Sequence, residues 1–185
     1  MIEDPILRGE EEQLVVFRLG DDYFAMLIAS VNEIIRLQKI TPVPKSPPFV
    51  EGVTNLRGRV ITVIDLRKRF GIASREDAHG GRIIVVEHGD KLMGMMVDGV
   101  DEVLTVPADA IEAVDEMVVS VDSQFLTGIV RLEDRLIIML DQEQVLTAGE
   151  VRELETMKIS RKALKDAQAE AEDEEAGLLP SGSAV

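Results

Sequence analysis

The sequence predicts a mainly β fold made of two tandem five-stranded β-barrels related by internal duplication, followed by a helical C-terminal tail. Three observations support this prediction. The chain repeats itself, each repeat consists of short β-rich runs separated by turn residues, and the residues after 146 lack that pattern.

The repeat appears as two ungapped matches in the same order. Residues 14–21 align with residues 83–90 at an offset of 69, and the match continues until Ile34 meets Val103. Residues 49–53 align with residues 125–129 at an offset of 76, and this match continues until Asp65 meets Asp141. The matches indicate duplication of a unit of roughly 60–70 residues, a size that can fold as a small barrel.

The elements of the first unit follow from β-rich runs and turn residues. We expect strands over 14–19, 23–28, 31–40, 49–54 and 59–65, turns at 20–22 and 55–58, an extended proline-rich loop at 42–48, and one helical turn over 66–70. The second unit repeats this plan from Arg82 to Asp141, after a loop over 73–81 and with a longer middle loop. Five short strands favour a closed barrel, because closure removes exposed sheet edges.

These elements divide the chain into four parts. We expect a flexible N-terminus over 1–12, a first barrel over about 13–72, a second over about 82–146, and a tail over 147–185. An exchange of strands between the two subdomains stays open. Residues 142–171 lack proline and are rich in Glu, Lys, Ala and Leu, which predicts helix interrupted at Gly149, and the acidic end of the tail is expected to be disordered.

Composition excludes several classes of function. The formal net charge of −15 repels phosphate and anionic lipid, which disfavours nucleic acid and membrane surfaces as partners. No apolar run reaches the roughly 20 residues needed to cross a bilayer, and the N-terminus lacks the plan of a signal peptide. A cytoplasmic protein without direct membrane insertion is therefore expected. Cysteine is absent, which removes disulfides and thiolate chemistry.

The sequence offers no constellation for catalysis or for a cofactor. The two histidines, His79 and His88, do not form a metal-binding spacing, and surface positions are the favoured interpretation. Phosphate-binding loops, dinucleotide fingerprints and nucleophile elbows are also missing. We therefore expect no metal, no cofactor and no enzymatic activity, although a site hidden in a groove between the barrels stays a minor alternative.

The segment from Gly52 to Gly58, read Gly-Val-Thr-Asn-Leu-Arg-Gly, and the segment from Val63 to Arg67, read Val-Ile-Asp-Leu-Arg, resemble the signature of the CheW family of chemotaxis coupling proteins. The stretches at 31–35, 97–100 and 125–128 resemble the same family in the expected order. The resemblance covers about residues 12–146 and implies two SH3-like barrels.

The resemblance also implies a function. The expected protein is a cytoplasmic adaptor that couples the signalling tips of methyl-accepting chemoreceptors to the regulatory domain of the histidine kinase CheA, within receptor arrays at the membrane. An adaptor for a non-flagellar chemosensory pathway, such as motility by pili, stays open as an alternative. A packing role against the second barrel is the favoured interpretation of the helical tail.

The resemblance assigns candidate residues to each role. The residues expected to contact the receptor are Val31, Asn55, Arg57 and Gly58. Those expected to contact the kinase are Glu33 and Ile34, and those expected to have a structural role are Gly52, Asp65 and Gly128. For Arg57, an ion pair within the barrel is an equally good interpretation. The internal repeat adds a criterion, since residues that differ between the two copies are not required by the fold in both. Arg57 faces Glu133 and Asn55 faces Arg131, whereas Glu33 recurs as Glu102.

Overall fold

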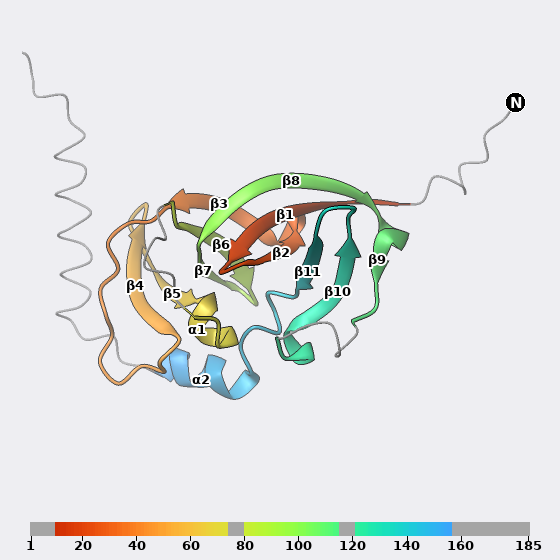
Figure 1. Cartoon of the computed structure of the whole chain (residues 1–185). Coiled ribbons are helices and arrows are strands. Elements are labelled where there is room, and N and C mark those ends of the chain that lie inside the picture. Colours follow the sequence, from red (N-terminus) through yellow and green to blue (C-terminus); the bar gives the residue numbers. More distant parts are fainter. Residues whose placement is uncertain (1–9, 74–79, 115–120, 157–185) are drawn as a thin grey trace, which may run out of the picture.

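The computed structural model describes residues 10–73, 80–114 and 121–156, and its described part contains two β-sheets with short helices beside them (Figure 1). The strands are β1 (Glu11–Leu19), β2 (Asp22–Leu27), β3 (Val31–Arg36), β4 (Val50–Leu56), β5 (Arg59–Asp65), β6 (Arg82–His88), β7 (Lys91–Val97), β8 (Gly99–Pro107), β9 (Ile111–Glu112), β10 (Leu126–Arg131) and β11 (Leu136–Leu140). The α-helices are α1 (Leu66–Phe70) and α2 (Ala148–Thr156). The predicted mainly β class is confirmed.

Each sheet combines strands of both sequence repeats. The first, barrel A, has the order β8-β1-β2-β11-β10-β9, and the second, barrel B, has the order β3-β6-β7-β5-β4. At the offsets of the repeat, β1 and β2 correspond to β6 and β7, while β8, β11 and β10 correspond to β3, β5 and β4. The two orders therefore match strand for strand, and each barrel is completed by the hairpin of the other unit.

This reciprocal exchange changes the expected boundaries. The intervals of about 13–72 and 82–146 are repeat units in the sequence, but they are not two separate barrels in space. The parallel pairing of β2 with β11 in barrel A is matched by that of β7 with β5 in barrel B. Barrel A also carries a sixth strand, the two-residue β9, where barrel B has a single bridge between Thr41 and Val53.

Other boundaries shift for local reasons. Residues 11 and 12 were expected in a flexible N-terminus, but β1 begins at Glu11 because β8 is long enough to pair with it as far as Pro107. Strand β3 ends at Arg36 rather than at residue 40. Residues 142–147 form turns instead of helix, so Gly149 lies in the first turn of α2 and interrupts nothing. The tail beyond residue 156 and His79 lie outside the described residues.

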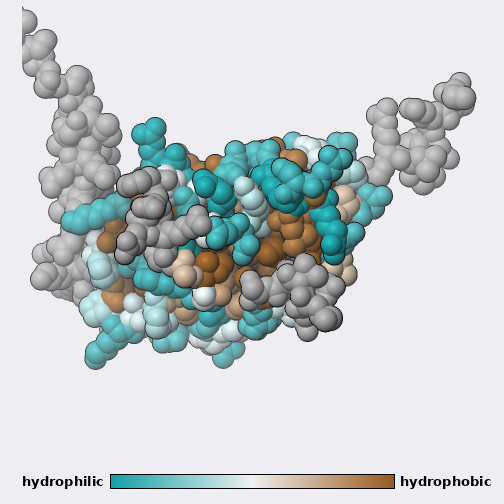
Figure 2. Space-filling view, in the orientation of Figure 1, coloured by the Kyte–Doolittle hydropathy of each residue, from teal (hydrophilic) through white to brown (hydrophobic). Residues whose placement is uncertain are grey.

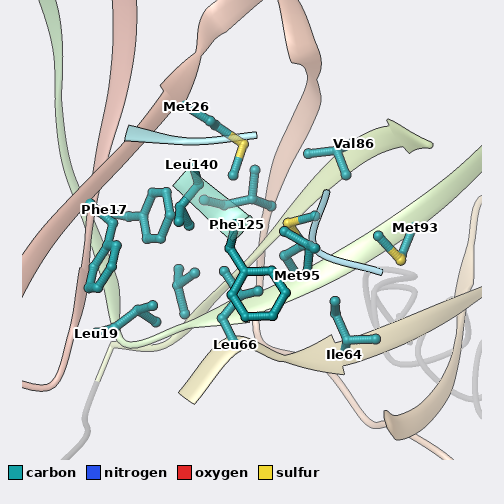
Figure 3. Packing of buried hydrophobic residues seen from close by; sticks show 14 of the residues in the cluster. Phe17, Leu19, Met26, Ile64, Leu66, Val86, Met93, Met95, Phe125 and Leu140 are labelled. Atoms are coloured by element: carbon teal, nitrogen blue, oxygen red, sulfur yellow. The ribbon is translucent and has the colours of Figure 1, made fainter. Parts of the chain in front are cut away.

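The largest apolar cluster lies between the two sheets and takes side chains from both of them (Figure 3). Phe17, Met26 and Leu140 enter it from barrel A, and Ile64 and Met95 enter it from barrel B. Burial of each large apolar side chain stabilises a fold by about 1.5–3 kcal/mol, so this shared layer holds the two barrels together. Smaller clusters fill the inside of each barrel.

Arg69 of α1 fixes the start of α2. Its guanidinium donates to both carboxylate oxygens of Glu150, at 2.9 and 2.8 Å, and its Nε donates to the carbonyl oxygen of Val145 at 2.7 Å. The same group lies 4.6 and 4.9 Å from the ring centroids of Phe49 and Phe125. Arg69 therefore joins the two repeats through one side chain.

Candidate functional site

The β4–β5 hairpin brings most of the receptor candidates together. Its two-residue turn consists of Arg57 and Gly58, with φ angles of 51° and 83°, so both residues have the positive φ of a type I′ turn. The side-chain oxygen of Asn55 accepts a hydrogen bond from the backbone N–H of Gly58 at 2.8 Å. Asn55 and Gly58 thus shape the turn, and Arg57 is the long side chain that the turn presents.

Arg57 pairs with Glu33 of β3. The distance from Nη2 of Arg57 to Oε2 of Glu33 is 2.9 Å, and the Arg57 side chain is 81% exposed. The pairing within the barrel that the sequence left open is therefore present, and it joins a receptor candidate to a kinase candidate. An ion pair this exposed contributes at most about 1 kcal/mol to stability. A partner protein can therefore compete for either group at small cost.

The second copy of this glutamate pairs with an arginine that is less exposed than Arg57. Glu102 pairs with Arg135, whose side chain is only 19% exposed and whose guanidinium lies 4.7 Å from the ring centroid of Tyr23. Each copy of the glutamate thus holds an arginine from the hairpin of the same repeat. In barrel A that arginine is part of the packing, whereas in barrel B it is displayed to solvent.

Val31 and Ile34 lie on β3, at one edge of barrel B. Val31 is half-buried and packs against the central cluster. Ile34 pairs with Ile84 of that cluster, yet its own side chain is 39% exposed. It belongs to a set of exposed large apolar residues that we call the apolar rim: Leu27, Ile28, Ile34, Leu37 and Val103.

The apolar rim follows the internal repeat in part. Val103 of β8 is the counterpart of Ile34 and, like it, lies on an edge strand and is exposed. Figure 2 shows apolar residues gathered within a face that is otherwise hydrophilic. Sequence reasoning missed Leu27, Ile28, Leu37 and Val103. Val103 lies on an edge strand, where one side must face solvent, and this was an available signal. Leu27 ends the central strand β2, Ile28 lies in the helical turn that follows it, and Leu37 follows β3.

Gly52, Gly128 and Asp65 sit at positions where the backbone requires them. A Cβ atom on Gly52, whose φ is 146°, would lie 2.1 Å from the carbonyl oxygen of Thr41. One on Gly128 would lie 2.6 Å from a methyl carbon of Ile111. Asp65 is 3% exposed and its Oδ1 accepts from the backbone N–H of Arg67 at 2.9 Å, which caps α1.

Asp98 forms a junction that sequence reasoning did not single out. It lies between β7 of barrel B and β8 of barrel A, inside the 97–100 stretch. Its Oδ2 accepts from the backbone N–H of Gly20 at 2.6 Å, and its Oδ1 pairs with Arg67 at 3.0 Å. One carboxylate thus ties the β1–β2 turn to α1 where the chain passes from one barrel to the other.

Within the described part of the chain, no group of three or more histidine, cysteine or acidic side chains could hold a metal ion. No helix within residues 10–73, 80–114 and 121–156 is long and apolar enough to span a bilayer.

Fold and site together define a double SH3-like barrel with exchanged hairpins, which displays an exposed Arg–Glu pair and an apolar rim. The CheW-like domain model matches residues 13–150. The chain belongs to the CheW-like family of chemotaxis scaffold proteins.

Named relatives agree with this assignment. The chemotaxis protein CheW of Klebsiella aerogenes is 33% identical over 147 residues, which cover 78% of this chain and 89% of that protein. CheW of Treponema pallidum is 29% identical over 152 residues, which cover 80% and 89%. The crystal structure of the scaffolding protein TtCheW from Thermoanaerobacter tengcongensis matches with a TM-score of 0.71 and 34% identity, and the match covers 80% of this chain and 96% of that chain.

Proposed function

We propose that this protein couples methyl-accepting chemoreceptors to the regulatory domain of the histidine kinase CheA. The observation that carries the proposal is the exposed Arg57–Glu33 pair on barrel B. Glu33 lies on the edge strand β3 together with Val31 and Ile34. Together they offer a displaceable charge pair beside apolar side chains, in a chain of the chemotaxis scaffold family.

The two kinds of surface suit different partners. Apart from Ile34, the apolar rim suits the apolar face of a receptor helix, which binds through side chains spaced along one helical face. Arg57 can pair with a carboxylate or a carbonyl oxygen of that receptor, because guanidinium forms directed hydrogen bonds. Glu33 and Ile34 are then left to the kinase, with Glu33 released from Arg57 as the receptor takes that arginine.

In this role the protein acts by binding alone and uses no cofactor. It works in the cytoplasm and is recruited to receptor arrays through the receptor tip. Moderate, reversible affinity is expected, since transient signalling interfaces are small and partly polar. Exposed ion pairs fit that requirement, because they orient the two partners and raise the association rate more than they raise the affinity.

The experiment is a calorimetric titration of the purified protein with a receptor signalling tip and, separately, with the kinase regulatory domain. We expect saturable binding to both, and weaker receptor binding for Arg57→Ala. Arg131→Ala is the matched control, since Arg131 forms an equally simple exposed pair with Glu112 on barrel A. Equal loss for both variants would refute a specific role for Arg57, and binding to neither partner would refute the function.

A further inference from the structure

The two barrels differ where one of them holds a stacked arginine. In barrel A, Arg135 lies over the ring of Tyr23, at 4.7 Å from its centroid. Tyr23 packs against the apolar interior of barrel A, next to β11, where it pairs with Ile137. The aromatic ring thus lies between a guanidinium and an aliphatic floor. The guanidinium forms a cation–π contact with the ring, and the floor buries apolar surface of the ring.

Barrel B lacks this ring. At the offsets of the repeat, Arg59 stands for Arg135, Leu92 stands for Tyr23, and Met93 stands for Phe24. The registers correspond, because Thr62 pairs with Met93 as Ile138 pairs with Phe24. Barrel B therefore has the arginine and the floor of the barrel A arrangement without its aromatic side chain.

A cavity of about 350 Å³ lies at this place. Its lining includes Arg59, Ile61, Leu92 and Met93 from barrel B, and Val151 and Leu154 from α2. The volume is at the lower end of the range for ligand pockets, which begins at roughly 300 Å³, and it is ample for one phenol ring.

Arg59, which lines the cavity, is free to contact a ligand. Arg59 is exposed and has no carboxylate partner within the part of the chain that the structure describes. The reason lies in the other copy: Glu102 holds Arg135, whereas its counterpart Glu33 is occupied by Arg57. His88 also lines the cavity, but its Nε2 atom is buried and lies 4.0 Å from the carboxylate of Glu143, which is outside the lining. His88 replaces Leu19 of barrel A, so the polar group is specific to barrel B.

We propose that this cavity binds a tyrosine side chain of a partner polypeptide, with the ring between Leu92 and the guanidinium of Arg59 as Tyr23 lies beneath Arg135. Tyr23 beneath Arg135 is the template for this choice, since a tyrosine ring is the side chain that the corresponding place of barrel A holds. A polypeptide is the expected source, because Lys91 of the lining already pairs with Glu155 at 3.2 Å, and the lining then offers no second unpaired Lys or Arg beside Arg59 to hold the carboxylate of a free amino acid. This proposal does not depend on which partner the Arg57 surface binds.

The test is an NMR titration of the full chain that follows the methyl signals of Leu92 and Met93. The probes are N-acetyl-L-tyrosinamide, N-acetyl-L-leucinamide and p-cresol. We expect saturable shifts with the capped tyrosine and at least threefold weaker binding of the capped leucine. Equal binding of the two capped amino acids, or binding of neither, overturns the proposal. Tighter binding of p-cresol than of the capped tyrosine overturns the assignment to a polypeptide.

Variants separate the site from general effects. Leu92→Tyr supplies the missing ring from within the chain, so it should abolish binding of the probe without lowering the melting temperature. Leu92→Met keeps the volume of the floor and should retain binding. Arg59→Ala should weaken binding about two- to fivefold, the loss expected for one exposed cation–π contact. Unchanged affinity in both Leu92→Tyr and Arg59→Ala would place the probe elsewhere and refute the site, even if one of the variants folds poorly.

Discussion

Replacement of Arg69 by alanine tests how the two repeats are held together beyond the apolar core. The side chain is 12% exposed and makes three charge-assisted hydrogen bonds, two to Glu150 and one to the carbonyl oxygen of Val145. It also lies over the rings of Phe49 and Phe125. All of these contacts are lost together in Arg69→Ala, and the Glu150 carboxylate, which is 23% exposed, keeps the backbone N–H of Thr147 as a donor but loses its cationic partner.

The magnitude follows from these contacts. Hydrogen bonds to charged groups contribute about 1.5–3 kcal/mol each when well buried, and each cation–π contact adds about 0.5–1 kcal/mol. These terms are not additive within one network, and Glu150 stays partly solvated, so we expect a loss of about 3–5 kcal/mol in the free energy of unfolding. Most domains have only about 5–15 kcal/mol in total, so the unfolding midpoint should fall sharply.

The assay is urea denaturation followed by far-ultraviolet circular dichroism, because the chain has no tryptophan and only one tyrosine. Arg152→Ala, on an exposed position of α2, is the control and should change stability by no more than about 0.5 kcal/mol. In a double-mutant cycle, Glu150→Ala should cost much less in the Arg69→Ala background than in the natural chain. A loss below about 1 kcal/mol for Arg69→Ala, or additive losses in the cycle, would show that α2 is held by its apolar face alone.

Three further substitutions test single contacts. Arg57→Ala should leave the melting temperature nearly unchanged, since its ion pair is exposed, while receptor binding weakens in calorimetry; a large drop in melting temperature would contradict this assignment. Gly52→Ala should cost more than about 3 kcal/mol in urea denaturation, because its Cβ would collide with the backbone of Thr41, whereas Gly58→Ala, with open space around it, should cost roughly 1 kcal/mol; equal costs would exclude the collision. Asp98→Asn keeps an acceptor for Gly20 but loses the charge facing Arg67, so a destabilisation of about 1–3 kcal/mol is expected, and none would mean that this junction is not stabilising.

Local features of the fold were accessible from the sequence, because turns and strand patterns depend on near neighbours. The Gly20 turn, the helical turn after Asp65 and the strand positions of the first repeat all follow from such signals. The sequence left an exchange of strands between the subdomains open, but it could not decide whether the exchange occurs. Each hairpin offers the same apolar pattern to either set of partners, so burial across both repeats decides the pairing.

The candidate site shows the same division. Motif and repeat could single out Arg57 and Glu33, but only the fold shows that they pair with each other. Symmetry alone suggested that the repeated glutamate is a fold requirement, and the structure gives it an arginine in each copy, one partly buried and one exposed. Arg69 carries no sequence signal, because its five contacts come from segments far apart in the chain.

The coupling itself is tested most directly by reconstitution of receptor, kinase and this protein on vesicles that carry the receptor signalling tips. Co-sedimentation of the kinase with the vesicles is measured with and without the purified chain, and with Arg57→Ala beside Arg131→Ala. We expect the chain to carry the kinase into the pellet. Arg57→Ala should reduce the amount of sedimented kinase, and Arg131→Ala should not. Sedimentation of the kinase that is the same with and without the chain would contradict the proposed coupling function.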